Sequence, residues 1–184
     1  MRILSQQLWQ TQKWRKKIKD IKERYLWLYL LSCPNSKTCG IFYIPTETIA
    51  NETKLSEEDV IKYLNHFKEL SMVDYNEETE EILIYNFPKY NIIRLGKPME
   101  DCLRSELSLV RDTNLIRKMI SYLEKYIEYR VNDKKINMLT NILNIYNKSI
   151  SISITTESLD DSCHDTKEED VDWDELMKLM EDDD

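Results

Sequence analysis

The chain has 184 residues, of which 41% are hydrophobic and 33% charged, and a formal net charge of -8. This length suffices for one core of moderate size or two small ones, and only two Gly and four Pro favour a fold dominated by helices. The longest apolar run, residues 25–31, is too short to span a bilayer and the first residues show no signal-peptide pattern, so we expect a cytoplasmic protein with no membrane partner.

The net charge hides a strong segregation along the chain. Residues 1–36 carry +6, residues 37–95 carry -5, residues 96–148 carry +3 and residues 149–184 carry -12. Because nearly all the excess negative charge lies in the last segment, the acidic balance does not exclude a nucleic-acid partner.

The first 20 residues combine tryptophans with a run of cations. This composition predicts a surface that packs on its own domain with one side and faces phosphates with the other, or else a solvated helix face. The candidate phosphate contacts are Lys13, Arg15, Lys16, Lys17 and Lys19.

The spacing of apolar residues predicts a helix over residues 20–31, which Pro34 cannot continue. A short β-rich run follows at residues 41–44. Thr46 is the predicted cap of a second helix, and Ser56 is the predicted N-cap of a third helix with Asp59 at its third position.

The third helix is the segment that would face DNA. We predict its inward stripe as Val60, Ile61, Leu64, Phe67 and Leu70, and its outward arc as Glu58, Asp59, Lys62, Asn65, His66 and Glu69. Lys62, Asn65 and His66 are therefore candidate DNA contacts, although the arc has no arginine to read base edges and three carboxylates oppose phosphates. His66 reads as a surface histidine and not as a catalytic group.

A β-hairpin over residues 73–75 and 82–87 completes the region. Its turn carries four glutamates, so we expect no DNA contact from it. The order of elements predicts a mainly α fold with a small β-hairpin, in which residues 1–95 form a winged helix-turn-helix domain.

Several short motifs occur in a characteristic order in the first half of the chain. They are Arg2-Ile3-Leu4-Ser5 with Trp9, the run at residues 26–31, the segment at residues 39–45, Ile49-Ala50 with Thr53, and the segment at residues 84–90. In this order they resemble the N-terminal winged-helix domain of phage replisome organisers and DnaD-like replication initiation proteins from phages of low-GC Gram-positive bacteria. The resemblance implies an initiator-type protein that binds DNA and recruits a replicative helicase, a helicase loader or another replisome protein.

Residues 96–148 predict a helical extension. Apolar residues recur at helical spacing after Pro98, from Thr113 to Tyr129 and over residues 132–147. This pattern fits helices that pack on the winged-helix domain, which we favour, and equally the seam of a homodimer.

The last segment, residues 149–184, predicts an acidic tail. Serine or threonine alternates with isoleucine over residues 149–156, which would suit a strand without an obvious partner, and residues 157–170 have the composition of a disordered linker. A short amphipathic helix is predicted at 172–181. Its apolar face would bind a replisome partner or return to its own domain; that face is formed by Trp173, Leu176, Met177 and Met180.

The sequence shows no Gly-rich phosphate loop and no cysteine spacing of a familiar metal site, so we expect a non-enzyme with free thiols and no cofactor. The first hypothesis is a phage replication accessory protein that binds DNA. Alternatives are a winged-helix protein that binds a host protein, and a transcriptional regulator, which would bind a palindrome as a dimer. The tail is expected to compete with DNA for the basic N-terminal segment.

Overall fold

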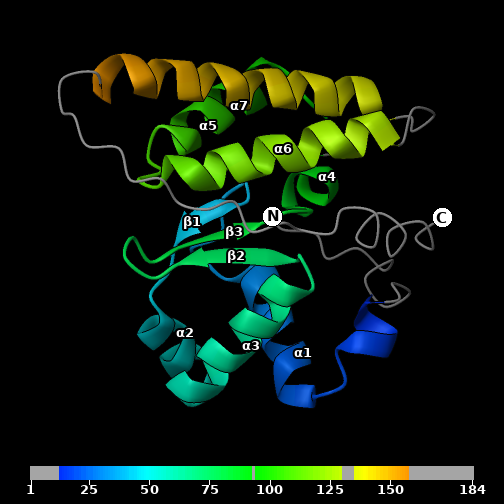
Figure 1. The fold of residues 1–184 in the computed structure, drawn as a ribbon, viewed down its shortest axis with the longest axis vertical. Helices are drawn as coiled ribbons and strands as arrows, with labels where there is room; N and C mark the ends of the chain where they lie inside the picture. The colour runs from blue at the N-terminus through cyan, green and yellow to red at the C-terminus, as the bar shows by residue number, and fades with distance from the viewer. Residues whose placement is uncertain (1–12, 93, 130–134, 158–184) are drawn as a thin grey trace.

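The computed structural model describes residues 13–92, 94–129 and 135–157. A three-stranded antiparallel sheet lies between two layers of helices, with α1, α2 and α3 on one side and α5, α6 and α7 on the other (Figure 1). The prediction of a mainly helical chain with a small antiparallel β-structure is confirmed.

The elements follow one another closely along the chain. A π-helical turn comes first and α4 joins the sheet to the second helical layer. The bounds are η2 Lys13–Lys17, α1 Ile21–Ser32, β1 Ile41–Tyr43, α2 Thr46–Thr53, α3 Glu57–Glu69, β2 Val73–Asn76, β3 Glu81–Ile84, α4 Phe87–Asn91, α5 Lys97–Leu107, α6 Thr113–Tyr129 and α7 Ile136–Glu157.

The strand order is β1-β3-β2, so β3 is the central strand. Leu83 of β3 is opposite Ile41 of β1 and Asp74 of β2, and opposed residues share one face of a sheet. Successive residues point to opposite faces, and all four residues of β3 are buried. Each face of the sheet therefore supports its own hydrophobic core.

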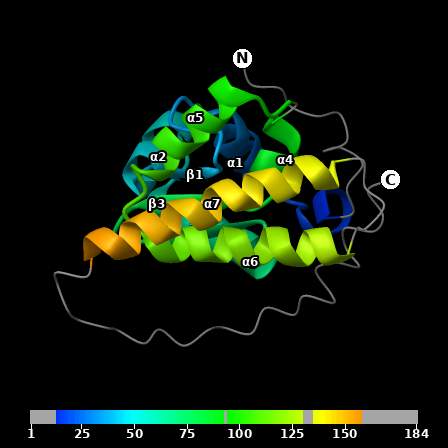
Figure 2. The ribbon, with the colours of Figure 1, turned by 90° about the horizontal axis from the view of Figure 1, so that it is seen from above.

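One core joins the sheet to α1, α2 and α3 through Phe42, Val73, Ile82 and Ile84. The other core joins the opposite face to α5, α6 and α7 through Ile41, Leu83 and Tyr85. The apolar stripe of α6 lies in this second core, so it is buried within the chain. In Figure 2, α6 and α7 lie alongside each other above the sheet.

Two predicted helix starts can be compared with the structure. The Ser56 hydroxyl accepts the N–H of Asp59 at 3.2 Å, which confirms Ser56 as the N-cap of α3. The prediction that Thr46 caps α2 was wrong. Pro45 is the N-cap, because its carbonyl accepts the N–H of Ile49, and the Thr46 hydroxyl instead donates to Glu57 of α3 at 2.8 Å.

The inward stripe of α3 is rotated relative to the prediction. Tyr63 is 4% exposed, whereas Ile61, predicted to be inward, is 42% exposed. Tyr63 takes the buried position that was predicted for Ile61. Its ring packs inside the protein, and its hydroxyl donates at 2.6 Å to Asp20, the N-cap residue of α1. Ile61 is displaced to the edge of the helix that faces the hairpin.

The end of the chain that the structure describes differs from expectation. Residues 149–156, which alternate serine or threonine with isoleucine, belong to α7 and form no strand. The preceding turns of α7 are anchored by Leu139, Ile142 and Tyr146, and extending a formed helix is easier than starting a strand without a partner. The Ser149 hydroxyl donates to the carbonyl of Ile145 within the helix at 3.0 Å.

Candidate nucleic-acid interface

The cations of the N-terminal segment lie on a turn that is fixed to α1. Trp14 is 3% exposed and Ile18 is fully buried. The Arg24 guanidinium donates to the carbonyls of Ile18 and Trp14 at 2.8 and 3.2 Å and lies 5.3 Å from the Trp14 ring centroid. Arg24 therefore serves the fold and holds the turn in place.

The same turn exposes the predicted phosphate contacts. Four of them lie on its outer surface, and we call these four the basic turn: Arg15, Lys16, Lys17 and Lys19. Within the residues that the structure describes, Arg15, Lys17 and Lys19 form no ion pair. The side chain of Lys13 lies outside the described part of the chain.

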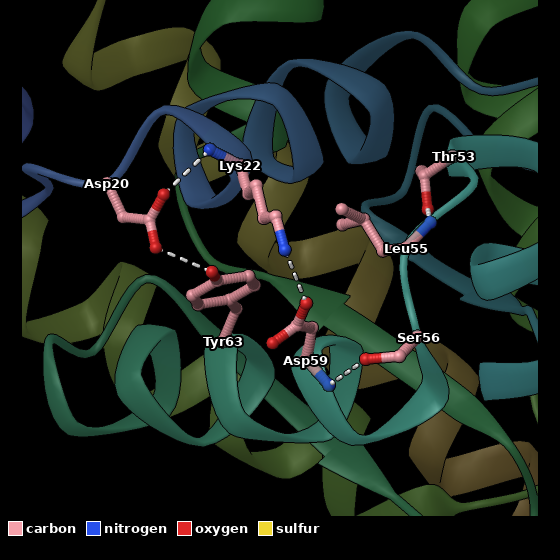
Figure 3. A network of polar contacts seen from close by, with 7 residues as sticks. All are labelled: Asp20, Lys22, Thr53, Leu55, Ser56, Asp59 and Tyr63. Carbon is pink, nitrogen blue, oxygen red and sulfur yellow. Dashed lines mark hydrogen bonds and ion pairs between the residues drawn. The ribbon is translucent and has the colours of Figure 1, made fainter.

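A polar network joins the start of α1 to α3 (Figure 3). The Asp20 carboxylate caps α1 by accepting the N–H of Lys22 at 2.9 Å and also accepts the Tyr63 hydroxyl. The Lys22 ammonium forms an ion pair with Asp59 at 3.0 Å. The hydrogen bond from Tyr63 lowers the pKa of Asp20, helped by the Lys22 N–H and by the charges of Lys22 and Lys62. Lys62 is thus brought close to the end of the basic turn.

The three predicted contacts on α3 have different surroundings. Lys62 is exposed, with its ammonium 5.6 Å from the Tyr63 ring centroid, and Asn65 is exposed. His66 is partly buried and its Nδ1 contacts the carboxylate of Glu23, a residue of α1 that is 4% exposed. His66 therefore joins α3 to α1, and Lys62 and Asn65 are the two that face solvent.

A groove of about 210 Å³ lies between α3 and the β2–β3 hairpin. Apolar side chains, polar side chains and charged side chains of both signs line it. Its lining residues are Thr46, Ile61, Leu64, Asn65, Lys68, Tyr75, Glu77 and Glu80. Sequence reasoning missed Ile61 here, because an isoleucine at helical spacing reads as a core residue.

The hairpin itself is tied to α6. The buried Glu81 carboxylate accepts the N–H groups of Arg111 and Asp112 at 2.9 and 2.8 Å, and the Arg111 guanidinium donates to the carbonyl of Thr79. Arg111 also lies 5.0 Å from the ring centroid of Tyr43. The exposed residues of the turn include Glu77 and Glu78 and no cation.

A buried carboxylate fixes β2 in the same way. Asp74 is 5% exposed and contacts the ammonium of Lys118 on α6 at 2.5 Å and that of Lys68 on α3 at 3.8 Å. Both lysines are therefore engaged in holding the sheet between the helical layers.

Possible metal ligands and thiols of the described residues can be placed in the fold. No group of three His, Cys, Asp or Glu side chains there could hold a metal ion. Cys33 and Cys39 are buried, and burial raises the pKa of the Cys39 thiol. Cys102 is exposed, and its thiol contacts the Glu106 carboxylate at 3.7 Å.

No helix in the described ranges is long and apolar enough to cross a bilayer. The predicted partner-binding residues Trp173, Leu176, Met177 and Met180 lie outside the described residues. Comparisons of the chain with known protein families, with curated proteins and with solved structures found no match.

Proposed function

We propose that this protein binds DNA as a replication accessory or initiation protein of the kind found in phages, in the cytoplasm of a bacterial host. The observation that carries the proposal is the basic turn, in which Trp14 and Ile18 anchor the chain while the four exposed side chains of residues 15–19 are all cationic. Supporting it, the order of α1, β1, α2, α3 and a β-hairpin is that of a winged helix-turn-helix.

The surroundings of α3 favour contact with phosphates over reading of bases. Its exposed surface includes Lys62 and Asn65 but also Glu57, Glu58 and Glu69, and it has no arginine. Phosphate contacts position a protein on DNA without conferring sequence specificity. We therefore expect modest sequence preference, with the basic turn and Lys62 supplying most of the affinity.

The salt dependence of DNA affinity tests this proposal. The variant R15Q/K17Q/K19Q removes three exposed cations. Loss of three phosphate contacts should make the negative slope of log affinity against log salt shallower by about 2.7 on duplex DNA. The four cations of the basic turn and Lys62 predict a wild-type slope near about -4.5, so the variant should keep a slope near about -1.8. K37Q/K97Q/K148Q, which changes three exposed lysines elsewhere, is the charge control. An unchanged slope in the triple variant would remove the basic turn from the proposal.

A second candidate function is the binding of a host or replisome protein. The groove between α3 and the hairpin favours it, because Ile61 is 42% exposed there beside Glu77 and Glu80. Two carboxylates beside an exposed apolar side chain suit a basic, partly apolar segment better than a phosphate backbone. Capture of partners from host lysate by the wild type and by Ile61→Glu, with and without nuclease, separates the candidates. Loss of every partner after nuclease would count against protein binding.

As part of the proposed replication function, the acidic tail recruits a helicase, a helicase loader or another replisome protein. Its test is a variant in which Trp173 and Met180 are replaced by serine. Loss of partner capture with unchanged DNA binding would assign recruitment to the tail.

A further inference from the structure

The outer side of α1 carries apolar side chains that lie at the surface of the described protein. Ile21 is 81% exposed, and Tyr25, one helical turn further on, is 48% exposed. The opposite side of α1 enters the core that it shares with the sheet through Leu26 and Leu30, which are fully buried. α1 is therefore apolar on its buried side and again on a side that faces solvent.

The basic turn leads directly into the start of α1 (Figure 1). Its last cation, Lys19, lies two residues before Ile21. Because the buried Trp14 and Ile18 fix the turn to α1, the exposed cations keep a constant position relative to Ile21 and Tyr25. We call this surface the α1 face: Arg15, Lys17, Lys19, Ile21 and Tyr25.

The carboxylates of α1 and α2 beside the α1 face are engaged within the protein. Asp20, between the turn and the helix, accepts two hydrogen bonds that close the start of α1 (Figure 3). Glu23 is buried between α1 and α3, and Glu52 accepts the hydroxyl of Tyr29, one turn beyond Tyr25, at 2.8 Å. No residue three or four positions from Tyr25 along α1 is acidic. The cations of the basic turn therefore dominate the charge at this face.

We propose that the α1 face is a binding site for single-stranded DNA, in which the Tyr25 ring stacks on an unpaired base. Exposed aromatic rings stack on the bases of single strands, whereas a duplex keeps its bases inside the helix. Ile21 extends the apolar surface beside the ring, and the basic turn neutralises the neighbouring phosphates. An apolar protein segment would leave these cations without a counter-charge, which favours a nucleic acid as the ligand. The inference rests on the proposed DNA-binding function and adds a strand preference to it.

Three variants of the full chain test the site with oligothymidylate and a duplex as probes. Tyr25→Ala should weaken single-strand affinity at least about fivefold, because the site loses one base stack. Tyr25→Phe keeps the ring and should retain at least about half of that affinity. R15Q/K17Q/K19Q should make the salt slope on single strands shallower by about 2.1, because each lost phosphate contact contributes about 0.7. Duplex affinity should change little in both variants of Tyr25.

Matched controls are available in the same chain. K37Q/K97Q/K148Q carries the same change of charge as the triple variant of the basic turn. Tyr43→Ala removes a ring of similar exposure, 47%, whose hydroxyl donates to the Glu80 carboxylate of the hairpin at 2.9 Å. Both controls should keep single-strand affinity, and thermal unfolding verifies that every variant is folded.

The two probes separate this inference from the proposed function. Unchanged single-strand affinity in Tyr25→Ala would overturn the site, even where R15Q/K17Q/K19Q loses duplex binding as proposed. Equal losses on both probes in Tyr25→Ala would overturn the strand preference. A wild-type dimer that Tyr25→Ala dissociates, with single-strand affinity intact, would assign the α1 face to a second copy of the chain and overturn the site equally. Full duplex affinity in the triple variant, with a single-strand loss in Tyr25→Ala, would overturn the role of the basic turn on duplex DNA and uphold the stacking site.

Discussion

Glu81, on the central strand, holds the start of α6 by accepting the backbone N–H of Arg111 at 2.9 Å. Its second carboxylate oxygen accepts the N–H of Asp112 at 2.8 Å, and the side chain is 2% exposed. A carboxylate at this position complements the positive end of the helix that begins at Thr113. One buried side chain thus joins the hairpin to the second helical layer.

Replacing Glu81 by alanine is expected to lower the free energy of unfolding by about 2 kcal/mol, since two part-buried N–H groups lose a buried charged acceptor. Urea denaturation measures the loss. Glu77→Ala, at an exposed position in the same hairpin, should change it by less than about 0.5 kcal/mol. Similar values for the two variants would contradict the proposed role of Glu81.

Gly40 has a φ of 76°, and an added Cβ would lie 2.9 Å from the Ile84 carbonyl oxygen and 3.0 Å from Phe87 Cβ. Gly40→Ala should therefore cost at least about 2 kcal/mol of stability, from the left-handed backbone and from crowding. Gly96→Ala is the matched control, because no atom lies within 4 Å of its added Cβ. We expect less than about 1 kcal/mol there, and a smaller loss at Gly40 than at Gly96 would refute the packing argument.

Alkaline pH should destabilise the protein. Burial, with the charges of Glu80 and Glu77, raises the pKa of Tyr75 to about 12, and burial also raises the pKa of Tyr85. The folded chain then holds these protons more tightly than the unfolded chain, whose tyrosines ionise near about pH 10. The stabilisation is complete below about pH 10 and is lost as the pH rises through about 12.

The measurement for this prediction is the urea midpoint between about pH 8 and 12. Tyr75→Phe loses the hydrogen bond from the hydroxyl to the Ile44 carbonyl, so it should be up to about 1 kcal/mol less stable than the wild type at neutral pH, but it should lose stability less steeply above about pH 10. A parallel decline in both proteins would show that Tyr75 makes no contribution to the alkaline transition.

Deleting residues 157–184 removes a net charge of -12 from the chain. We expect tighter DNA binding, since a tethered polyanion competes with phosphates for the basic turn. The gain should be largest at low salt, where such competition is least screened. Titration of full-length and shortened protein with one duplex at two salt concentrations decides the point, and an equal or weaker affinity after deletion would reject autoinhibition by the tail.

Local signals explain the parts of the fold that the sequence predicts well. The Ser56 side chain favours the N-cap of a helix, and it caps α3 as predicted. The apolar stripe of α6 likewise marks a helix with one buried face. The candidate cations of the basic turn follow from composition alone, and their exposure agrees with that reading.

The partners of these elements could not be predicted, because they depend on contacts between distant parts of the chain. β3 reads in the sequence as one arm of a hairpin, yet it is the central strand with a core on each face. His66 reads as a surface residue until α1 places Glu23 against it. Lys89 gains its aromatic surroundings only when Tyr126 is folded over α4.

The sequence by itself determined where helices begin, which segments are cationic and which residue patterns seek burial, since these depend on side-chain chemistry over a few neighbouring residues. The tertiary structure decided which polar groups remain available to a partner. Glu81, Asp74 and His66 are engaged inside the protein because packing two helical layers on one sheet brings opposite charges and backbone donors to them. The exposed cations of the basic turn remain at the surface because only their neighbours Trp14 and Ile18 find an apolar core to enter.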